Sequence, residues 1–300
     1  MFAYIQTLWL FTSNDHQTTV YPWIAFGIIG ALSGSALTTN QSPDFWTIIS
    51  RLPQTFLWMW LNTLAFTVAN RRLPSSVIED AINKPWRPLP SGRITIDQAR
   101  HLLLTIIPTL FILTLYVGGT EFALVGLVLN WMHNDLGGAD DSYIVRNLIN
   151  ALGLVCWTAG TISVACGGEH TLNLMGRRWL AIEGAVIFTT LHVQDLRDEA
   201  GDRARGRKTA PIVLGSAVTR WTIALAVLFW SFLCPTIWAL SIYGFGMPVI
   251  LGTVLAFRVL FLTSVEADKM TWKLWALWIS SLFVLPLCAN PGVFNYFVVG

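Results

Sequence analysis

The chain has 300 residues, of which 54% are hydrophobic and only 12% are charged, and its formal net charge is +2. Soluble domains carry about 25% charged residues, so this composition excludes an ordinary soluble protein, whose surface would need more polar groups to face water. The small net charge gives no sign of a nucleic-acid partner, and no motif indicates an obligate protein partner. We therefore expect the lipid bilayer to be the main surroundings of the chain.

Six long runs of the sequence contain no Asp, Glu, Lys or Arg: residues 16–43, 52–70, 102–120, 147–168, 221–257 and 274–300. A helix needs roughly 20 apolar residues to cross the hydrocarbon core of a bilayer. We predict nine helical segments in a single membrane domain that covers residues 1–300. Their cores are Tyr21–Thr39, Phe45–Asn70, His101–Gly118, Phe122–His133, Val145–Cys166, Trp179–Gln194, Trp221–Tyr243, Met247–Ser264 and Trp272–Asn290.

The basic residues gather in two of the connecting loops. Nine crossings would put the loops after even-numbered segments on the same side as the N-terminus. Two of these loops, residues 71–100 and 196–220, hold twelve of the nineteen basic residues. Loops rich in Lys and Arg stay in the cytosol. We therefore predict a cytosolic N-terminus and a C-terminus across the membrane.

The denser of two acidic clusters lies in the second basic loop. Asp195, Asp198 and Asp202 are spaced so that three carboxylates share one face of an α-helix. Like charges at this spacing repel, and Mg²⁺, which binds one or two carboxylates together with substrate phosphates, would relieve the repulsion. Arg207 and Lys208 follow and suit the remaining phosphate oxygens. The alternative interpretation is a solvated helix in which the aspartates pair with arginines.

The other acidic cluster follows the second predicted segment. Ser76, Asp80, Asn83 and Lys84 fall on one face of a helix that Pro85 ends. An ordinary charged loop with prolines is the alternative interpretation. Because both clusters combine acidic and basic residues on the same predicted side of the membrane, a joint site is favoured.

These two stretches resemble the paired motifs of the UbiA-type intramembrane prenyltransferase superfamily. The matching residues are Asp80 and Asn83-Lys84-Pro85-Trp86-Arg87-Pro88-Leu89-Pro90-Ser91-Gly92-Arg93 in the first motif, and Asp195, Asp198, Asp202, Gly206, Arg207, Thr209 and Pro211 in the second. The resemblance covers nearly the whole chain. It implies an all-α integral membrane fold, a ring of nine transmembrane helices whose active site faces the cytosol. Arg-Leu-Pro before Ser-x-x-Glu-Asp is similar to a fungal branch that includes sesquiterpene cyclases, and we expect the endoplasmic reticulum as the location.

The first motif departs from the family pattern. The family usually has Asn and two Asp residues where this chain has, in order, Arg72, Leu73 and Ser76. Glu79 and Asn70 are candidates to replace the missing groups, although Glu79 points about 100° away from Asp80 on an α-helix. How a first metal ion would be held is thus left open by the sequence.

The resemblance implies that the substrate is an allylic prenyl diphosphate, with farnesyl diphosphate preferred. It implies catalysis by Asp80, Asp195, Asp198 and Asp202, magnesium ligands among Asp80, Glu79, Asn83, Asp195, Asp198 and Asp202, and diphosphate contacts from Asn83, Lys84, Arg87, Arg207 and Lys208. Mg²⁺ and fixed cations would stabilise the charge that grows on the leaving diphosphate. The isoprenoid tail would lie among the apolar helices, where aromatic faces attract a carbocation.

Two enzyme functions fit this site. A terpene cyclase would ionise the diphosphate and close a ring within the same molecule, and a prenyltransferase would pass the cation to an aromatic or lipid acceptor. The altered first motif favours the cyclase. A CDP-alcohol phosphatidyltransferase is disfavoured because its Asp-Gly-x-x-Ala-Arg signature is absent from the sequence. A non-catalytic transporter is disfavoured because no internal repeat is evident.

Several other polar residues have two interpretations. Asp135 and Arg146, after the fourth segment, either join the site or belong to a solvated turn. His192 precedes Asp195 by three residues and either contacts the diphosphate or is satisfied within its own helix. Glu183 lies at membrane depth, where ionisable residues are costly and often functional.

Overall fold

The structure, a computed structural model, describes residues 2–290 and consists of helices. Its longer helices are α2 (Tyr21–Leu32), α4 (Leu52–Arg71), α6 (Ile96–Val117), α7 (Thr120–Asn134), α9 (Tyr143–Ala165), α10 (Leu174–Thr190), α13 (Ser216–Ile237), α14 (Ile242–Phe261) and α15 (Val265–Phe283). Each predicted segment overlaps one of these helices. Among the described residues, the β-structure is limited to one isolated antiparallel bridge between Thr38 and Leu172.

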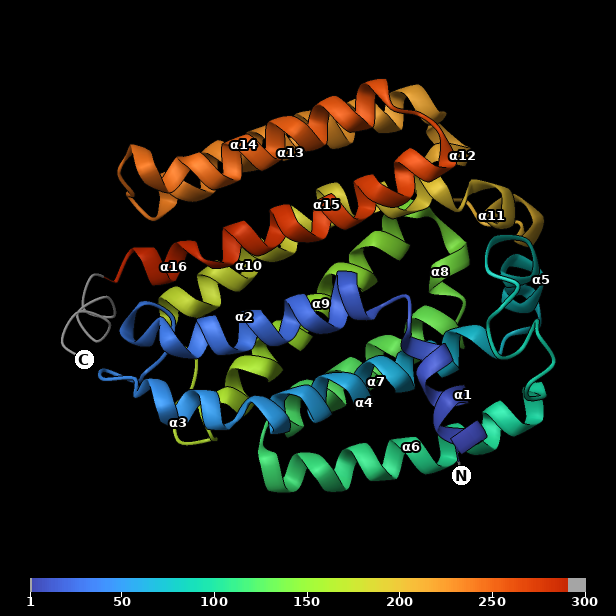
Figure 1. Cartoon of the computed structure of the whole chain (residues 1–300), viewed down its shortest axis with the longest axis horizontal. Helices are drawn as coiled ribbons and strands as arrows, with labels where there is room; N and C mark the ends of the chain where they lie inside the picture. Colours follow the sequence, from blue (N-terminus) through green and yellow to red (C-terminus); the bar gives the residue numbers. More distant parts are fainter. Residues whose placement is uncertain (1, 291–300) are drawn as a thin grey trace.

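Shorter helices connect the long ones. They are α1 (Phe2–Thr12), α3 (Phe45–Ser50), α5 (Pro74–Asn83), α8 (Gly138–Asp141), α11 (Glu199–Arg205), α12 (Ala210–Leu214) and α16 (Leu285–Cys288), together with the π-helix η1 (His16–Val20) and the 3₁₀ helices η2 (Gly34–Ala36) and η3 (Leu191–Arg197). The long helices lie side by side, and α5, α8, α11 and α12 gather at one end of the bundle (Figure 1). Both predicted motifs are therefore at that end.

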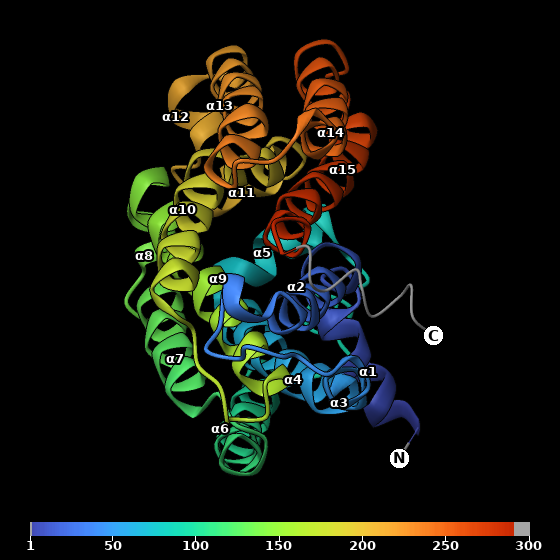
Figure 2. The same ribbon diagram turned by 90° about the vertical axis from the view of Figure 1, so that its left-hand side faces the viewer.

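Seen end-on, α9 occupies the middle of the bundle (Figure 2). It packs against α2, α4, α7 and α10, while α13, α14 and α15 pack on one another. Five segments are long and apolar enough to cross a membrane: Ile96–Val117, Tyr143–Ala165, Ser216–Ile237, Ile242–Phe261 and Val265–Cys288. By length and composition, these helices are those of an integral membrane protein.

Local sequence signals explain where several helices begin and end. The Thr95 side chain accepts from the Gln98 amide and the Gln98 side chain accepts from Thr95, which forms a capping box at the start of α6. Asn173 caps α10 in a similar way by accepting from the Gly176 amide at 2.8 Å. Gly118 and Gly119 have φ values of 95° and 73°, which only glycine adopts readily, and they allow α7 to begin directly after α6.

Some predicted boundaries differ from the observed ones. The first segment was expected to continue to Thr39, but α2 ends at Leu32 because Gly34 turns the backbone with a φ of 53°. The second segment is divided at Arg51 into α3 and α4, since Pro53 lacks the amide that would continue the α3 hydrogen bonds. The sixth segment ends in the 3₁₀ helix η3.

Two glycines let α9 approach its neighbours closely. A Cβ atom at Gly160 would lie 2.1 Å from the ring of Trp58 on α4. A Cβ atom at Gly27 on α2 would lie 2.6 Å from Cβ of Thr161. Larger residues at either position would collide with the facing helix, so these glycines fix the position of α9 in the bundle.

Residues 1 and 291–300 lie outside the part of the chain that the structure describes. The position predicted for the C-terminus, across the membrane, falls in this part. The single domain predicted over residues 1–300 stays a prediction.

Candidate active site

The two predicted motifs meet where α5 packs against α11. The Asn83 side chain links them, because its Nδ2 donates to the Asp198 carbonyl oxygen at 3.0 Å and its Oδ1 accepts from the Gly201 amide at 3.2 Å. A Cβ atom at Gly201 would lie 2.2 Å from Asn83 Nδ2, so glycine is needed at this contact. Segments more than a hundred residues apart are thereby joined at one end of the bundle.

Lys84 and Asp198 form the second link between the motifs. Lys84 Nζ donates to both carboxylate oxygens of Asp198, at 2.8 and 3.0 Å. Burial raises the pKa of Asp198, but the charges of Lys84 and Arg197 outweigh this effect and bring the pKa down to about 2. Burial lowers the pKa of Lys84. The aspartate is therefore fully ionised at neutral pH.

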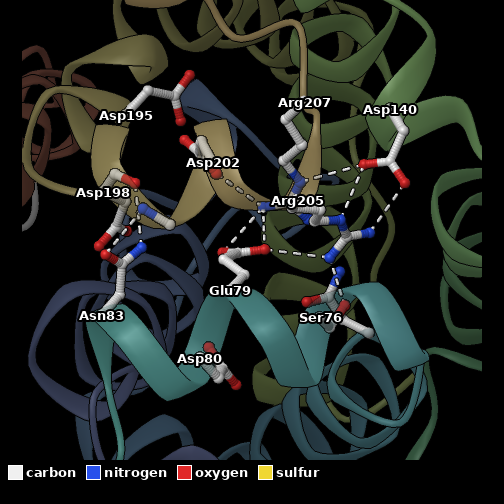
Figure 3. A network of polar contacts seen from close by, with 12 residues as sticks. Ser76, Glu79, Asp80, Asn83, Asp140, Asp195, Asp198, Asp202, Arg205 and Arg207 are labelled. Carbon is white, nitrogen blue, oxygen red and sulfur yellow. Dashed lines mark hydrogen bonds and ion pairs between the residues drawn. The ribbon is translucent and has the colours of Figure 1, made fainter.

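Glu79 faces the second motif from the middle of α5 (Figure 3). Its carboxylate accepts from Arg205 Nη1 at 3.1 Å and from Arg207 Nη1 at 3.1 Å. Ser76, one turn earlier, accepts from Arg205 as well. The charge of Glu79 is thus matched by two arginines of the second motif.

Asp140 on α8 holds the same two arginines from the other side. Arg205 donates to it through Nε at 3.1 Å and Nη2 at 3.0 Å, and Arg207 donates through Nε at 3.2 Å. The sequence indicated polar residues after the fourth segment but did not single out Asp140 or Arg205. The signal that could have identified both residues is that their two loops are predicted to lie on the same side of the membrane.

Asp195 and Asp202 form the deepest part of the site. Both oxygens of Asp195 accept from Arg146 Nη1 at 2.7 Å, and Arg207 Nη1 donates to Asp202 Oδ1 at 3.3 Å. Arg146 therefore joins the site and does not belong to a solvated turn. Burial, together with the charges of Asp195 and Glu79, raises the pKa of Asp202 to about 7. Burial also raises the pKa of Asp195.

This carboxylate set fits a hard divalent cation. Within residues 2–290, no three Asp, Glu, His or Cys side chains already enclose a metal position. However, Asp202 Oδ2 is buried and makes no hydrogen bond, and its pKa is raised partly by neighbouring negative charges. Mg²⁺ needs only one or two carboxylates when substrate phosphates complete its shell. The free oxygen of Asp202 fits that requirement, and the Asp195 carboxylate, which now accepts from Arg146, lies in the same group.

The structure turns Asp80 away from this group. Glu79, and not Asp80, lies between Ser76 and Asn83 on the face of α5 that meets α11, and Asp80 points to the opposite side (Figure 3). There its Oδ1 accepts from Arg87 while its Oδ2 is buried without a partner. The prediction that Asp80 shares the site-facing side of the helix with Ser76 is therefore wrong. The side of α5 that contacts α11 carries Ser76, Glu79 and Asn83, which are spaced i, i+3 and i+7.

The remaining predicted residues lie at the edge of the site. Lys208 is exposed and, unlike Arg207, makes no ion pair with a described residue. Asn70 donates to Asn134 Oδ1 at 2.7 Å and does not contact the carboxylates. His192 lies 3.2 Å from the Thr222 hydroxyl, and burial lowers its pKa to about 4, so it is neutral.

A cavity runs from the site into the bundle. Arg146, Arg197, Arg207 and Gln194 line it beside the site, and the rest of its lining mixes apolar and polar residues. The apolar residues include Phe66, Leu129, Ile149, Leu154, Trp157 and Leu191, and the polar ones include Thr63, Thr67, Asn130, His133 and Asn150. The rings of Phe66 and Trp157 meet edge-to-face, with 5.9 Å between their centroids. The arrangement suits a molecule with a charged head and an apolar tail.

Comparison with known proteins agrees with this geometry. The family described as the UbiA prenyltransferase family matches residues 27–282. A fumagillin beta-trans-bergamotene synthase from Aspergillus fumigatus is 34% identical over 79% of this chain and 76% of that protein. A somaliensene A/B synthase from Streptomyces somaliensis is 29% identical over 95% of this chain and 92% of that protein.

The fold also matches a solved structure. A UbiA homolog from Archaeoglobus fulgidus, bound to GPP and Mg²⁺, superposes with a TM-score of 0.63 over 95% of this chain and 99% of that chain. The two sequences are 13% identical, so this likeness concerns the fold alone. Because the family match covers most of the chain and extends over both motifs, the protein is an enzyme that belongs to the UbiA prenyltransferase family.

Proposed function

We propose that the protein is a Mg²⁺-dependent, membrane-bound terpene cyclase that ionises an allylic prenyl diphosphate, preferably farnesyl diphosphate, and closes the carbocation to a sesquiterpene. The observation that carries the proposal is the meeting of both motifs beside a cavity that Arg207 of the second motif lines together with apolar side chains. The synthases from Aspergillus and Streptomyces support a cyclase over other members of the family.

Asp202 and Asp195 are the side chains proposed to hold Mg²⁺, with Glu79 beside them. The orphaned oxygen of Asp202 and its raised pKa support this choice, since a cation would remove the repulsion that now favours a proton. When bound, the metal ion supplies positive charge to the diphosphate oxygens as the C–O bond breaks. Asp80 and Asp198 contribute by holding Arg87 and Lys84 in place.

The basic side chains are proposed to bind the diphosphate by exchanging partners. Lys84, Arg146, Arg205 and Arg207 each form an ion pair with a carboxylate of the site, as does Arg87 with Asp80. A magnesium diphosphate brings positive and negative charge together, so it can insert into these pairs with little change in net charge. Asn83 fixes the geometry of α5 and α11 while this happens.

The apolar part of the cavity is proposed to hold the isoprenoid chain. Leaving water out protects the carbocation from capture, and the faces of Phe66 and Trp157 offer electron-rich surfaces to it. Ring closure then requires only a double bond of the same chain and the loss of one proton. No second substrate is needed for a cyclase.

We further propose that the long helices form a ring of nine transmembrane segments in the endoplasmic reticulum, with the site on the cytosolic side. The support is the concentration of basic residues in α11 and in the segments that flank α5 and α11, helices that gather at one end of the bundle (Figure 1). A reporter tag placed in the loop after α11 should react with reagents that reach only the cytosol.

One experiment separates the cyclase from a prenyltransferase. The purified protein in nanodiscs receives Mg²⁺ and farnesyl diphosphate without any acceptor, and diphosphate and hydrocarbons are measured. We expect equal amounts of diphosphate and a cyclic hydrocarbon, with neither in the presence of EDTA or in Asp202→Asn. If product appears only after an aromatic acceptor is added, the protein is a prenyltransferase, and the cyclase proposal is wrong.

A further inference from the structure

Gly153 is a glycine that the protein's own packing does not require. It lies in the interior of α9, where glycine destabilises a helix by about 1 kcal/mol relative to alanine. Gly160 on the same helix is accounted for, because the Trp58 ring takes the place of its side chain. A Cβ atom at Gly153, in contrast, would meet no atom within 4 Å. Its φ is also not one that excludes other residues.

The open space beside Gly153 belongs to the cavity. One face of α9 lines it, and the residues on that face are Arg146, Ile149, Asn150, Gly153, Leu154 and Trp157. Arg146 contacts Asp195 at the charged mouth. Gly153 follows seven residues later, which places it roughly 10 Å deeper along the helix. The position is thus beyond the diphosphate site and before the aromatic end.

The opposite wall shows which parts of the cavity are already filled. Gly126 on α7 also lines the cavity, but a Cβ atom there would lie 3.5 Å from Trp157 Nε1, an ordinary van der Waals distance. The Trp157 side chain therefore already occupies the space in front of Gly126. Only at Gly153, among the glycines that line the cavity in the described structure, does the missing side chain leave room that nothing takes.

We infer that Gly153 determines which prenyl chains the enzyme accepts, because the isoprenoid chain occupies the space that a side chain at this position would fill. The inference rests on the proposed function and extends it to one specificity-determining residue. A methyl group at 153 narrows the cavity midway along the chain, and a branched side chain closes it. Short chains end before this point, while longer chains must pass it.

The test compares the binding of prenyl chains of different length. Wild type, Gly153→Ala and Gly153→Leu are titrated with the non-hydrolysable thiolodiphosphate analogues of geranyl, farnesyl and geranylgeranyl diphosphate. Quenching of tryptophan fluorescence reports binding, since Trp157 and Trp272 line the cavity. The matched control is Gly246→Leu on α14, where an added Cβ also meets no atom within 4 Å but which does not line the cavity.

We expect Gly153→Leu to weaken farnesyl and geranylgeranyl binding relative to geranyl binding by at least about tenfold, the effect of one surplus methylene in a tight apolar pocket. Gly153→Ala should shift the same ratio less and should raise the melting temperature, because alanine favours the helix. Gly246→Leu should leave the ratio unchanged.

An unchanged ratio of affinities in both Gly153 variants would overturn the inference, as would an equal loss for all three chains accompanied by a lower melting temperature. Gly153→Ala keeps the test decisive if the leucine variant does not fold. Since binding of the analogues does not depend on turnover, a wild type that binds them but forms no hydrocarbon would refute the cyclase proposal and leave this inference standing.

Discussion

Lys84 at the end of α5 donates to both oxygens of Asp198, at 2.8 and 3.0 Å, across 114 residues of sequence. The pair is largely buried, with side-chain exposures of 11% and 20%. A cation and an anion from different motifs are thus held together before any ligand arrives. A ligand that displaces one of these two side chains must supply a counter-charge to the other.

The first prediction concerns this ion pair. Asp198→Asn leaves the Lys84 ammonium buried without a counter-charge, so we expect a loss of about 2–3 kcal/mol of stability, somewhat below the value for fully buried pairs. Turnover should also fall. Thermal unfolding and diphosphate release measure the two effects. The control is Glu199→Gln, which breaks an exposed pair with Arg203 that contributes at most about 1 kcal/mol. Equal effects of the two substitutions would contradict the prediction.

The second prediction separates the two neighbouring carboxylates of α5. Glu79→Gln removes one of the negative charges that raise the pKa of Asp202, so that pKa should fall and the Mg²⁺ concentration for half-maximal activity should rise. Asp80→Asn should leave the Mg²⁺ dependence near that of wild type and raise the KM for the diphosphate, because Arg87 loses its partner. The opposite pattern in magnesium titrations would show that Asp80 is the metal ligand.

The third prediction concerns Asp140 as a positioning residue for the arginines. It binds Arg205 and Arg207 but is itself half exposed, so Asp140→Asn should fold normally. We expect KM to rise by roughly tenfold, equivalent to about 1.4 kcal/mol, with a smaller change in kcat. The exposed neighbour Asp141 is the matched control, and Asp141→Asn should match wild type. If kcat fell and KM stayed constant, Asp140 would not act through substrate binding.

The fourth prediction is the pH dependence of stability in the metal-free protein. The pKa of Asp202 is about 7 in the folded protein, against the ordinary value of 3.8 expected in the unfolded chain. At a pH between these two values, the folded chain keeps a proton that the unfolded chain loses. The free energy of unfolding should therefore decline as pH rises from about 4 to about 7 and level off above. Asp198 has the opposite effect, because folding lowers its pKa to about 2. Its ionised form stabilises the fold above about pH 4, and this contribution is lost as the pH falls toward 2.

Thermal unfolding across this pH range checks the prediction. Asp202→Asn should flatten the decline between pH 4 and 7, and Mg²⁺ added to wild type should do the same by replacing the proton. A stability profile that Asp202→Asn does not alter would mean that the carboxyl group titrates normally.

The sequence allowed the helical framework and the meeting of the motifs to be predicted, because both depend on local patterns. Uncharged runs mark the long helices, and the joint placement of Asn83 and Lys84 follows from motifs on one side of the bundle. The choice of Glu79 over Asp80 could not be predicted, since the two differ only in which side of α5 packs on α11. The 3₁₀ helix η3 likewise replaces the continuous α-helix that the spacing of Asp195 and Asp202 indicated.

The contacts of Asp140 with Arg205 and Arg207 could not be predicted for a different reason. Their partners lie in other loops, and the distances between loops are set by how the long helices pack. Arg146 lies on α9, in a run with few charges, where its role becomes clear only through Asp195. Contacts of this kind are a property of the assembled bundle and leave no periodic trace in the sequence.

The contact between Trp58 and Gly160 has an evolutionary consequence. Because the indole occupies the place of a side chain on α9, that helix cannot slide or rotate against α4 without a steric collision. The contact therefore holds the backbone of the cavity wall that α9 supplies in one position. We expect related enzymes to change the cavity by replacing single side chains on this fixed helix. Their sequences should vary at positions such as 153 and retain the pair at 58 and 160.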